Sequence, residues 1–339
     1  MRKDRQLLAE FSVPDLRILA WRGEDKDGRE KLCILYVAGG RIVRLDTQKE
    51  GELFPGDIYM ARVLKRQPNL DAAFADIGKD RNVFLPGDHK TGEELPLMIR
   101  TTAYRDKLAR ATDRLPEEMK EEILARAAHS IKGSLLYAAE RPLDKSLRIA
   151  AETEGAKWLT EDPQLYERAA KLAPQAPARL HADERIGLCE LYGLRSKTER
   201  VFSNRVLLDS GAELVFAETE ALCAIDVNSA KADKGRDKEA AGLLINREAA
   251  KEIAFQLKLR RIAGIVLIDF ISMKKKESET ILLEELSEAM RANEVDGRVE
   301  DITKLGIVEL SVRRFGPSLS AERSFVNSTI LTKDEKNTR

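Results

Sequence analysis

The sequence predicts a mixed α/β (α+β) protein of several subdomains, and three observations lead to this class. Two short apolar runs, ALCAIDVNS and GIVLIDF, are rich in β-branched residues and indicate strands buried on both faces. A helical stretch lies between them, as in a crossover that makes two strands parallel. From about residue 54 to 110, short strands, glycine turns and aromatic residues alternate, which is typical of a small β-barrel.

The first 50 residues are expected to form a meander of strands. The runs LRILAW and KLCILYVAGGRIVRL are separated by a charged turn, and Gly39 and Gly40 mark a second reversal. Because a meander of this size rarely folds alone, we expect it to pack against a later segment of the chain.

The barrel segment combines aromatic and basic residues. Phe74 and Phe84 lie ten positions apart. Barrels of the OB type bind single-stranded nucleic acid by stacking bases on such aromatic residues within a basic groove. The alternative, that both phenylalanines are core residues, stays open. Residues 115–143, beyond the barrel, are expected to be a packing helix with an acidic first turn. Five basic residues accompany the aromatic pair: Arg62, Lys65, Arg66, Lys79 and Arg81.

Each of the two apolar runs ends in an acidic residue, Asp226 in the first and Asp269 in the second. Residues 246–261 between them carry an apolar stripe at helical spacing. A strand–helix–strand crossover would bring the carboxyl ends of both strands, and both carboxylates, to one edge of a sheet. Paired oxygen ligands hold a Mg²⁺ ion that keeps most of its water and acts on phosphoryl oxygens. The alternative for either Asp taken alone is a structural role, as a helix cap or a turn residue, without a bound metal.

Composition excludes several classes of function. The 58 basic and 58 acidic side chains cancel, so any affinity for nucleic acid must come from a local basic surface and be salt-sensitive. Three scattered cysteines and three scattered histidines give no disulfide framework and no basis for histidine chemistry. No apolar run approaches transmembrane length, and charge and proline interrupt the amino-terminal apolar residues. We therefore expect a cytoplasmic protein without a membrane partner.

The segments SGAELVFAETEALCAIDVNSAK, INREAAKEIAFQLKLRRIAGIVLIDFISM and LGIVELSVRRFGPSL closely resemble the ribonuclease E/G family of bacterial endoribonucleases. The resemblance is dense over roughly residues 201–320 and weaker through GDIYMARV, DAAFADIG and AYRDKLAR. It implies that Asp226 and Asp269 bind a catalytic Mg²⁺, with Mn²⁺ as a substitute. It further implies that Asn228 orients a carboxylate or the scissile phosphate; a strand-end turn is the alternative for this residue.

For the barrel, the resemblance implies that Phe74, Phe84 and Lys107 grip single-stranded RNA. It also implies a layout in which an RNase H-like subdomain contains an inserted OB-fold barrel and is followed by a DNase I-like catalytic subdomain. The expected boundaries are 1–50 with about 150–200 for the RNase H-like part, 51–111 for the barrel, 112–150 for a reduced helical remnant of the family's 5′-end sensor, 201–325 for the catalytic part and 326–339 for a tail.

The implied function is that of a magnesium-dependent endoribonuclease for single-stranded RNA, in RNA processing or decay, that leaves 5′-phosphate and 3′-hydroxyl ends. Two alternatives from other classes stay open: a non-catalytic RNA-binding protein that retains the barrel, and a phosphodiesterase for DNA or small substrates. Single-stranded RNA is the expected partner, and whether the chain forms a homodimer is left open.

Several positions depart from the family pattern. Ala230 stands where Gly is usual, Ser272 where Asp is usual, and Val312 where Arg is usual. None is a presumed metal ligand, so the departures bear on rate and substrate range. The family's zinc-linking cysteine pair and the Arg-Thr pair of its 5′ sensor have no counterpart, so we expect no zinc and a sensor that is reduced or lost. Whether the 5′ end of the substrate is sensed at all is left open. The basic loop 231–238 is either a phosphate contact or a solvated loop.

Overall fold

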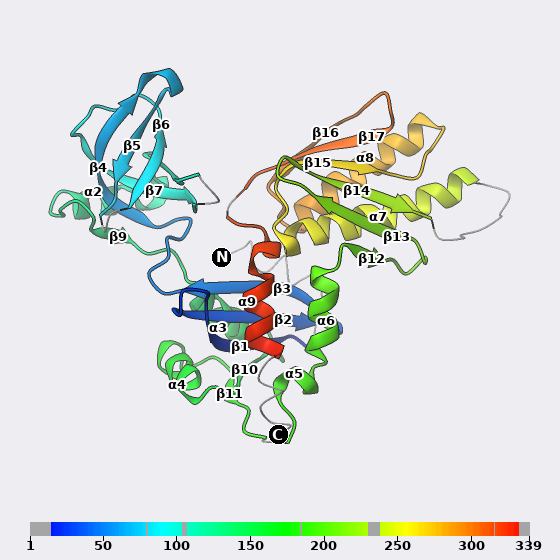
Figure 1. Ribbon diagram of the computed structural model, residues 1–339, viewed down its shortest axis with the longest axis horizontal. Coiled ribbons are helices and arrows are strands. Elements are labelled where there is room, and N and C mark those ends of the chain that lie inside the picture. Colours follow the sequence, from blue (N-terminus) through cyan, green and yellow to red (C-terminus); the bar gives the residue numbers. More distant parts are fainter. Residues whose placement is uncertain are drawn as a thin grey trace. The chain divides into compact units, whose positions relative to one another are not determined.

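The computed structural model (Figure 1) divides into two compact units. The first unit takes residues up to Lys49, Pro142–Arg314 and the chain from Ser318 onward. The second unit takes Glu50–Arg141 and residues 315–317. The structure describes residues 15–78, 81–103, 107–183, 185–229, 238–314 and 316–331.

One sheet of the first unit has the strand order β11–β10–β1–β2–β3. Its first three strands form an antiparallel meander, and β10 and β11 add to the β1 edge in parallel. The meander of the amino-terminal segment is therefore completed by strands from much later in the chain. The strands are β1 (Arg17–Glu24), β2 (Glu30–Ala38), β3 (Arg41–Lys49), β10 (Lys157–Thr160) and β11 (Ala178–Leu180).

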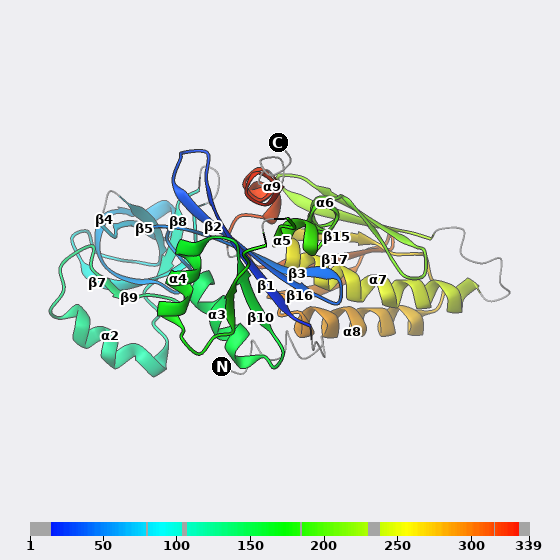
Figure 2. The ribbon, with the colours of Figure 1, turned by 90° about the horizontal axis from the view of Figure 1, so that it is seen from below.

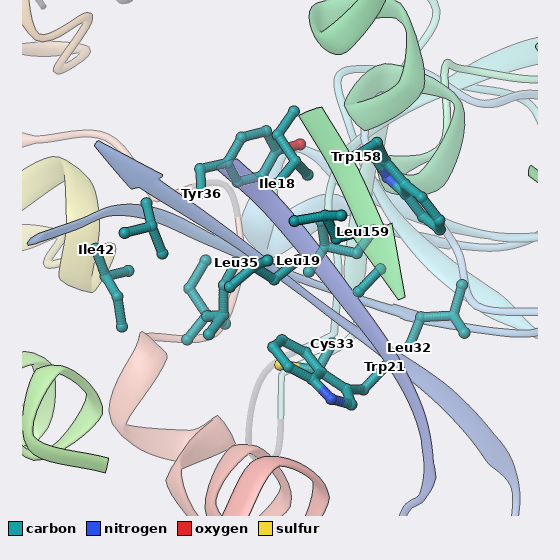
Figure 3. Packing of buried hydrophobic residues seen from close by; sticks show 14 of the residues in the cluster. Ile18, Leu19, Trp21, Leu32, Cys33, Leu35, Tyr36, Ile42, Trp158 and Leu159 are labelled. Carbon is teal, nitrogen blue, oxygen red and sulfur yellow. The ribbon is translucent and has the colours of Figure 1, made fainter. Parts of the chain in front are cut away.

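Apolar side chains cover both faces of this first sheet (Figure 3). Tyr36 and Trp158 lie in register with Ile18 and share one face, whereas Trp21 and Cys33 lie in register on the other. The fully buried Trp158 donates its indole N–H to Ser146 Oγ at 2.9 Å, which satisfies its polar atom. Helical elements supply the covering layers: α3 (Pro142–Glu152), α4 (Pro163–Leu172), α5 (Leu188–Leu191), α6 (Leu194–Phe202), the 3₁₀ turn Leu319–Glu322 and α9 (Arg323–Leu331).

The second sheet of the first unit has the order β12–β13–β14–β15–β17–β16, and β14 and β15 are its parallel pair. The predicted strand–helix–strand crossover is confirmed. Its helix begins at Lys238 rather than near Asn246, because residues 238–245 are mostly good helix formers and Gly242 and Ile245 extend the buried side of the helix. Figure 2 shows α7 and α8 side by side along the sheet. The elements are β12 (Arg205–Leu207), β13 (Glu213–Glu218), β14 (Leu222–Asn228), α7 (Lys238–Arg260), β15 (Gly264–Asp269), α8 (Lys276–Ala292), β16 (Gly297–Ile302) and β17 (Ile307–Val312).

The second unit contains a closed five-stranded barrel of the OB-like type. The ring runs β4–β5–β6–β8–β7 and returns to β4, with β6 and β8 in parallel. None of the described helices in either unit is long and apolar enough to cross a membrane. The barrel elements are β4 (Ile58–Gln67), the 3₁₀ turn Pro68–Leu70, β5 (Ala72–Asp76), β6 (Asn82–Pro86), β7 (Glu94–Thr101) and β8 (Ala109–Thr112).

The prediction of a helix over residues 115–143 is wrong for the second half of that segment. A 3₁₀ turn (Glu117–Met119) and α2 (Lys120–Ala127) form there, but the chain then turns into β9 (Leu135–Tyr137), which pairs with β4. Gly133 has a φ of +89° and a Cβ at this position would lie 3.0 Å from Gly78 Cα. The positive φ is not helical, and together with the close backbone approach it requires glycine at this position.

A buried carboxylate ties the two ends of the barrel unit together. Asp57 is fully buried and accepts hydrogen bonds from Phe54 N at 3.1 Å, Ala139 N at 2.9 Å and Arg141 Nη1 at 2.8 Å. It thereby joins the segment that enters the barrel to the segment that leaves it. Removing one partner of such a network leaves the other groups without compensation.

We expect Asp57→Ala to lower the free energy of unfolding by about 3 kcal/mol, because Arg141 and two backbone N–H groups lose their acceptor. Urea unfolding followed by circular dichroism measures this change. The matched control is Asp88→Ala, which removes an exposed ion pair with Arg66 and should cost less than about 1 kcal/mol. Equal losses in the two variants would contradict the assigned role of Asp57.

Candidate functional site

Two acidic residues lie side by side at the carboxyl ends of the parallel strands. The register of β14 and β15 pairs Asp226 directly with Asp269. Burial alternates along both strands, so that Ile225, Val227 and Ile268 enter the core beneath α7 and α8 while both carboxylates are exposed. The pair therefore projects from the sheet face opposite the two helices.

Asn228 lies on the same face as Asp226, two positions along β14. Its Nδ2 donates to Asp226 Oδ2 at 2.7 Å, which restrains one carboxylate oxygen. Within the described parts of the chain, no Lys or Arg forms an ion pair with Asp226 or Asp269. The predicted meeting of the two carboxylates, with the asparagine beside them, is thus present, and their negative charge is not neutralised by a described side chain.

A buried asparagine of α7 holds the chain just beyond Asp269. Asn246 is fully buried; its Nδ2 donates to Ile271 O at 2.8 Å, and its Oδ1 accepts from Ile271 N at 3.0 Å. Glu239 on the same helix accepts from the backbone N–H groups of Lys274 and Lys275, bonds that lower the pKa of its carboxyl. The helix therefore fixes the segment after β15 at two points, and with it the position of Asp269.

Sequence reasoning did not identify Asn246 as a functional residue. The sequence nevertheless contains an indication of its role, because Asn246 lies on the apolar stripe that includes Ala249 and Ile253. A polar side chain at such a buried position needs a hydrogen-bond partner. The sequence does not show which backbone segment supplies that partner.

Two further acidic residues, Glu161 and Asp162, follow β10 of the first sheet, and other groups of the protein bind both carboxylates. Glu161 accepts from Trp21 Nε1 at 3.1 Å and from Leu188 N at 2.6 Å. Asp162 pairs with Arg22 at 2.7 Å and caps the amino terminus of α4. Because these carboxylates are engaged in holding the fold, the carboxylate pair at Asp226 and Asp269 is the better candidate for chemistry.

The barrel carries a row of aromatic and basic side chains across four strands. In register, Lys65 of β4 faces Phe74 of β5, Phe74 faces Phe84 of β6, and Phe84 faces Arg110 of β8. The two rings meet edge to face with centroids 6.1 Å apart, and the Arg110 guanidinium lies 5.4 Å from the Phe84 centroid. This aromatic row is defined as Lys65, Phe74, Phe84 and Arg110.

The aromatic row lies on the outside of the barrel. Phe74 and Phe84 are half-buried, whereas their strand neighbours Ala73, Ala75 and Val83 form the barrel core. Half-exposed rings flanked by cations suit base stacking. Sequence reasoning missed Arg110, since only the pairing of β6 with β8 brings it to Phe84.

The remaining basic candidates of the barrel differ in their surroundings. Lys107 is exposed and lies three positions before Arg110. Arg62 is 3.9 Å from Glu94, and Arg66 is 2.7 Å from Asp88, so carboxylates partly neutralise both. Arg81 is half-buried. Lys79 lies outside the described residues.

The positions that depart from the family pattern fall in different environments. Ser272 is exposed, one residue beyond the backbone that Asn246 holds. Val312 is buried in the core of the second sheet, where β17 pairs it with two glycines. Ala230 and residues 231–237, which include most of the basic loop, lie outside the described residues.

The donor set at the strand ends suits a hard cation. The described residues contain no group of three or more His, Cys, Asp or Glu side chains that would enclose a metal. Two adjacent exposed carboxylates instead fit an ion such as Mg²⁺, which keeps several waters and binds few protein ligands. Cys223 on β14 faces the core, and burial raises its pKa to about 12, so it is not a thiolate at neutral pH.

The fold and the site thus define a multi-subdomain α/β protein that combines an OB-like barrel with a carboxylate pair on a one-sided sheet. The chain belongs to the Ribonuclease E/G family, which it matches over residues 87–315. It is 26% identical to Ribonuclease E of Escherichia coli (strain K12), over 86% of this chain and 36% of that protein.

Two further relatives show higher identity over shorter stretches. Ribonuclease E of Nostoc sp. is 35% identical over 43% of this chain and 21% of that protein. Ribonuclease G of Haemophilus influenzae is 35% identical over 38% of this chain and 26% of that protein. The matched region therefore spans well under half the length of these curated relatives.

We expect Asn246→Ala to free the backbone after β15 and to cost about 2 kcal/mol of stability, because two hydrogen bonds to Ile271 are lost in a buried site. Hydrogen–deuterium exchange of a peptide covering residues 268–273 measures the local effect, which should be faster exchange in the variant. The control is Asn293→Ala, which removes a side-chain hydrogen bond to the carbonyl of Ala289 at the end of α8. It should leave the exchange rate of that peptide unchanged. Unchanged exchange in Asn246→Ala would show that Asn246 does not hold this segment.

Proposed function

We propose that this protein is an endoribonuclease that hydrolyses phosphodiester bonds in single-stranded RNA. The observation that carries the proposal is the in-register pair Asp226 and Asp269 on the open face of the sheet, in a chain of the Ribonuclease E/G family. The names of the relatives, ribonuclease E and ribonuclease G, support the substrate class. The outward aromatic row of the barrel supports it independently, because stacking requires unpaired bases.

Asp226 and Asp269 would hold Mg²⁺, with Mn²⁺ as a substitute. When bound, the ion would supply charge neutralisation at the scissile phosphate and activation of water. The carboxylates provide the two oxygen ligands, and their exposure leaves room for water and a phosphate. Asn228 holds Asp226 in orientation through its amide, as outer partners of metal ligands do. Attack by water rather than by the ribose 2′-hydroxyl leaves 5′-phosphate and 3′-hydroxyl ends and no cyclic phosphate.

In the barrel, Phe74 and Phe84 would stack bases, with Lys107 contacting the backbone. The half-exposed rings and the exposed lysine support these roles. Stacking is tolerant of sequence, because every base presents an aromatic face.

The proposal includes an assignment of subdomains. The strand order β11–β10–β1–β2–β3, with β10 and β11 parallel to β1, supports an RNase H-like subdomain drawn from residues 1–50 and about 150–200. The sheet that bears Asp226 and Asp269 would be the DNase I-like subdomain. The short α2 is consistent with a reduced 5′ sensor in residues 112–150. Buried cysteines without disulfides suit a cytoplasmic location.

Asp226→Asn and Asp269→Asn should each lower the rate of cleavage of an AU-rich single-stranded RNA by at least about 100-fold, because each removes a charged ligand at the reacting phosphate. Both variants should still bind the RNA, because they leave the aromatic row of the barrel unchanged. Gel analysis of a 5′-labelled oligonucleotide with magnesium measures the rates. Asp209→Asn, an exposed carboxylate in the turn after β12, is the control and should cut normally.

Two outcomes would contradict this assignment. Cleavage that persists in both aspartate variants would place the chemistry elsewhere. A wild-type protein that binds the RNA but does not cut it with any divalent metal would instead be an RNA-binding protein without catalysis.

Phe74→Ala should weaken binding of single-stranded RNA by roughly 5- to 150-fold, because stacking of one base on an aromatic ring contributes about 1 to 3 kcal/mol. Fluorescence anisotropy with the metal-free protein gives the Kd apart from cleavage. Leu70→Ala is the control, since Leu70 is 63% exposed and lies outside the aromatic row. Equal affinities for Phe74→Ala and Leu70→Ala would exclude stacking on this ring.

A further inference from the structure

An arginine of the edge strand lies in the same row of the second sheet as the carboxylate pair. Arg205 of β12 faces Val215 of β13, and Val215 faces Asp226, which in turn faces Asp269. Residues that face each other across strands project from the same side of a sheet. Two strand spacings, roughly 10 Å, separate the backbone of Arg205 from that of Asp226.

Burial fixes the side of the sheet on which Arg205 lies. Val206, its neighbour in β12, packs against the core beneath α7 and α8. Arg205 and Leu207 therefore project from the opposite, open face, and Leu207 is 75% exposed. Val215 is half-buried and forms an apolar floor between Arg205 and the carboxylates.

The guanidinium of Arg205 is held by a weak, exposed ion pair. It pairs with Glu213 of β13, and the Arg205 side chain is 60% exposed. An exposed ion pair of this kind contributes between about 0 and 1 kcal/mol. A phosphate diester can replace the carboxylate, because the guanidinium fork binds two phosphate oxygens at once. Glu213 therefore keeps Arg205 extended over the open face without preventing exchange for a ligand.

We infer that Arg205 binds a phosphate of the RNA strand next to the scissile phosphate, so that the strand crosses the sheet from β15 towards the β12 edge. This inference rests on the proposed endoribonuclease function. Asp226 and Asp269 repel the RNA backbone until a cation is bound, and a fixed arginine in the same row offsets that repulsion for the neighbouring phosphate. Arg205 touches no reacting atom and acts by holding the strand in register with the carboxylates.

The test measures binding of a fluorescent single-stranded RNA by the full chain at several KCl concentrations, followed by cleavage kinetics. Arg205→Ala should weaken binding on the order of 10-fold at low salt and reduce the slope of log K against log salt by about 0.7, the value for one lost phosphate contact. KM should rise while kcat changes little. Arg205→Lys should recover part of the slope, since it keeps the charge without the fork.

Glu213→Gln should change the RNA affinity in the opposite direction. It removes the competing carboxylate and should tighten RNA binding, by about 2- to 5-fold for an exposed pair. The matched control is Arg247→Ala, which breaks an exposed ion pair with Glu285 between α7 and α8. That pair lies on the helical side of the sheet, so the salt slope should equal that of the wild type.

The outcomes separate this inference from the function on which it rests. If the wild type cuts RNA and Arg205→Ala shows the wild-type salt slope, the phosphate contact is wrong and the function stands. If the wild type binds RNA without cutting it and Arg205→Ala lowers the slope, the contact stands and the catalytic proposal fails. If the wild type neither binds nor cuts single-stranded RNA, both are overturned.

Discussion

The parallel pairing of β14 with β15 is the constraint on which the candidate site depends. It places Asp226 opposite Asp269, and a shift of one residue would turn one carboxylate into the core. Two features prevent such a shift. The alternating apolar residues of both strands must enter the core beneath α7 and α8, and Asn246 binds the backbone at Ile271. The position of the acids is therefore set by the burial of their neighbours rather than by contacts of their own.

The two sheets of the first unit illustrate what distinguishes a site from a structural cluster. Both have acidic residues at or just beyond strand ends. Around Glu161 and Asp162, an indole N–H, a guanidinium and backbone N–H groups satisfy the carboxylates within the fold. Among the described residues, Asp226 accepts one side-chain hydrogen bond, from the amide of Asn228 on its own strand, and its carboxylate is exposed. A carboxylate whose hydrogen-bonding capacity is left for a ligand can hold a cation, whereas a satisfied one stabilises the protein.

The sequence predicts the features that depend on local pattern. The run of apolar residues before each Asp, and the helical stripe between the runs, are sufficient to predict the crossover and the meeting of the carboxylates. Features that depend on distant contacts are not predictable in this way. Nothing near Asn246 in the sequence indicates that it binds Ile271, and nothing near Arg110 or Arg205 indicates which strand lies beside each. The second half of the helix expected at 115–143 is likewise set by distant contacts, since β9 pairs with β4 and Gly133 lies against Gly78 from another part of the chain.

The balance of charge determines how such a chain can hold RNA. With equal numbers of acidic and basic residues, general attraction to a polyanion is weak. Many surface cations are also paired, as Arg62 and Arg66 are in the barrel. Affinity must then come from cations placed beside apolar surfaces, such as Arg110 against Phe84 and Arg205 beside Val215. Stacking on an aromatic ring is insensitive to salt, and each cation neutralises only one phosphate. The RNA affinity of a neutral protein therefore depends more on a few ordered contacts than on added charge.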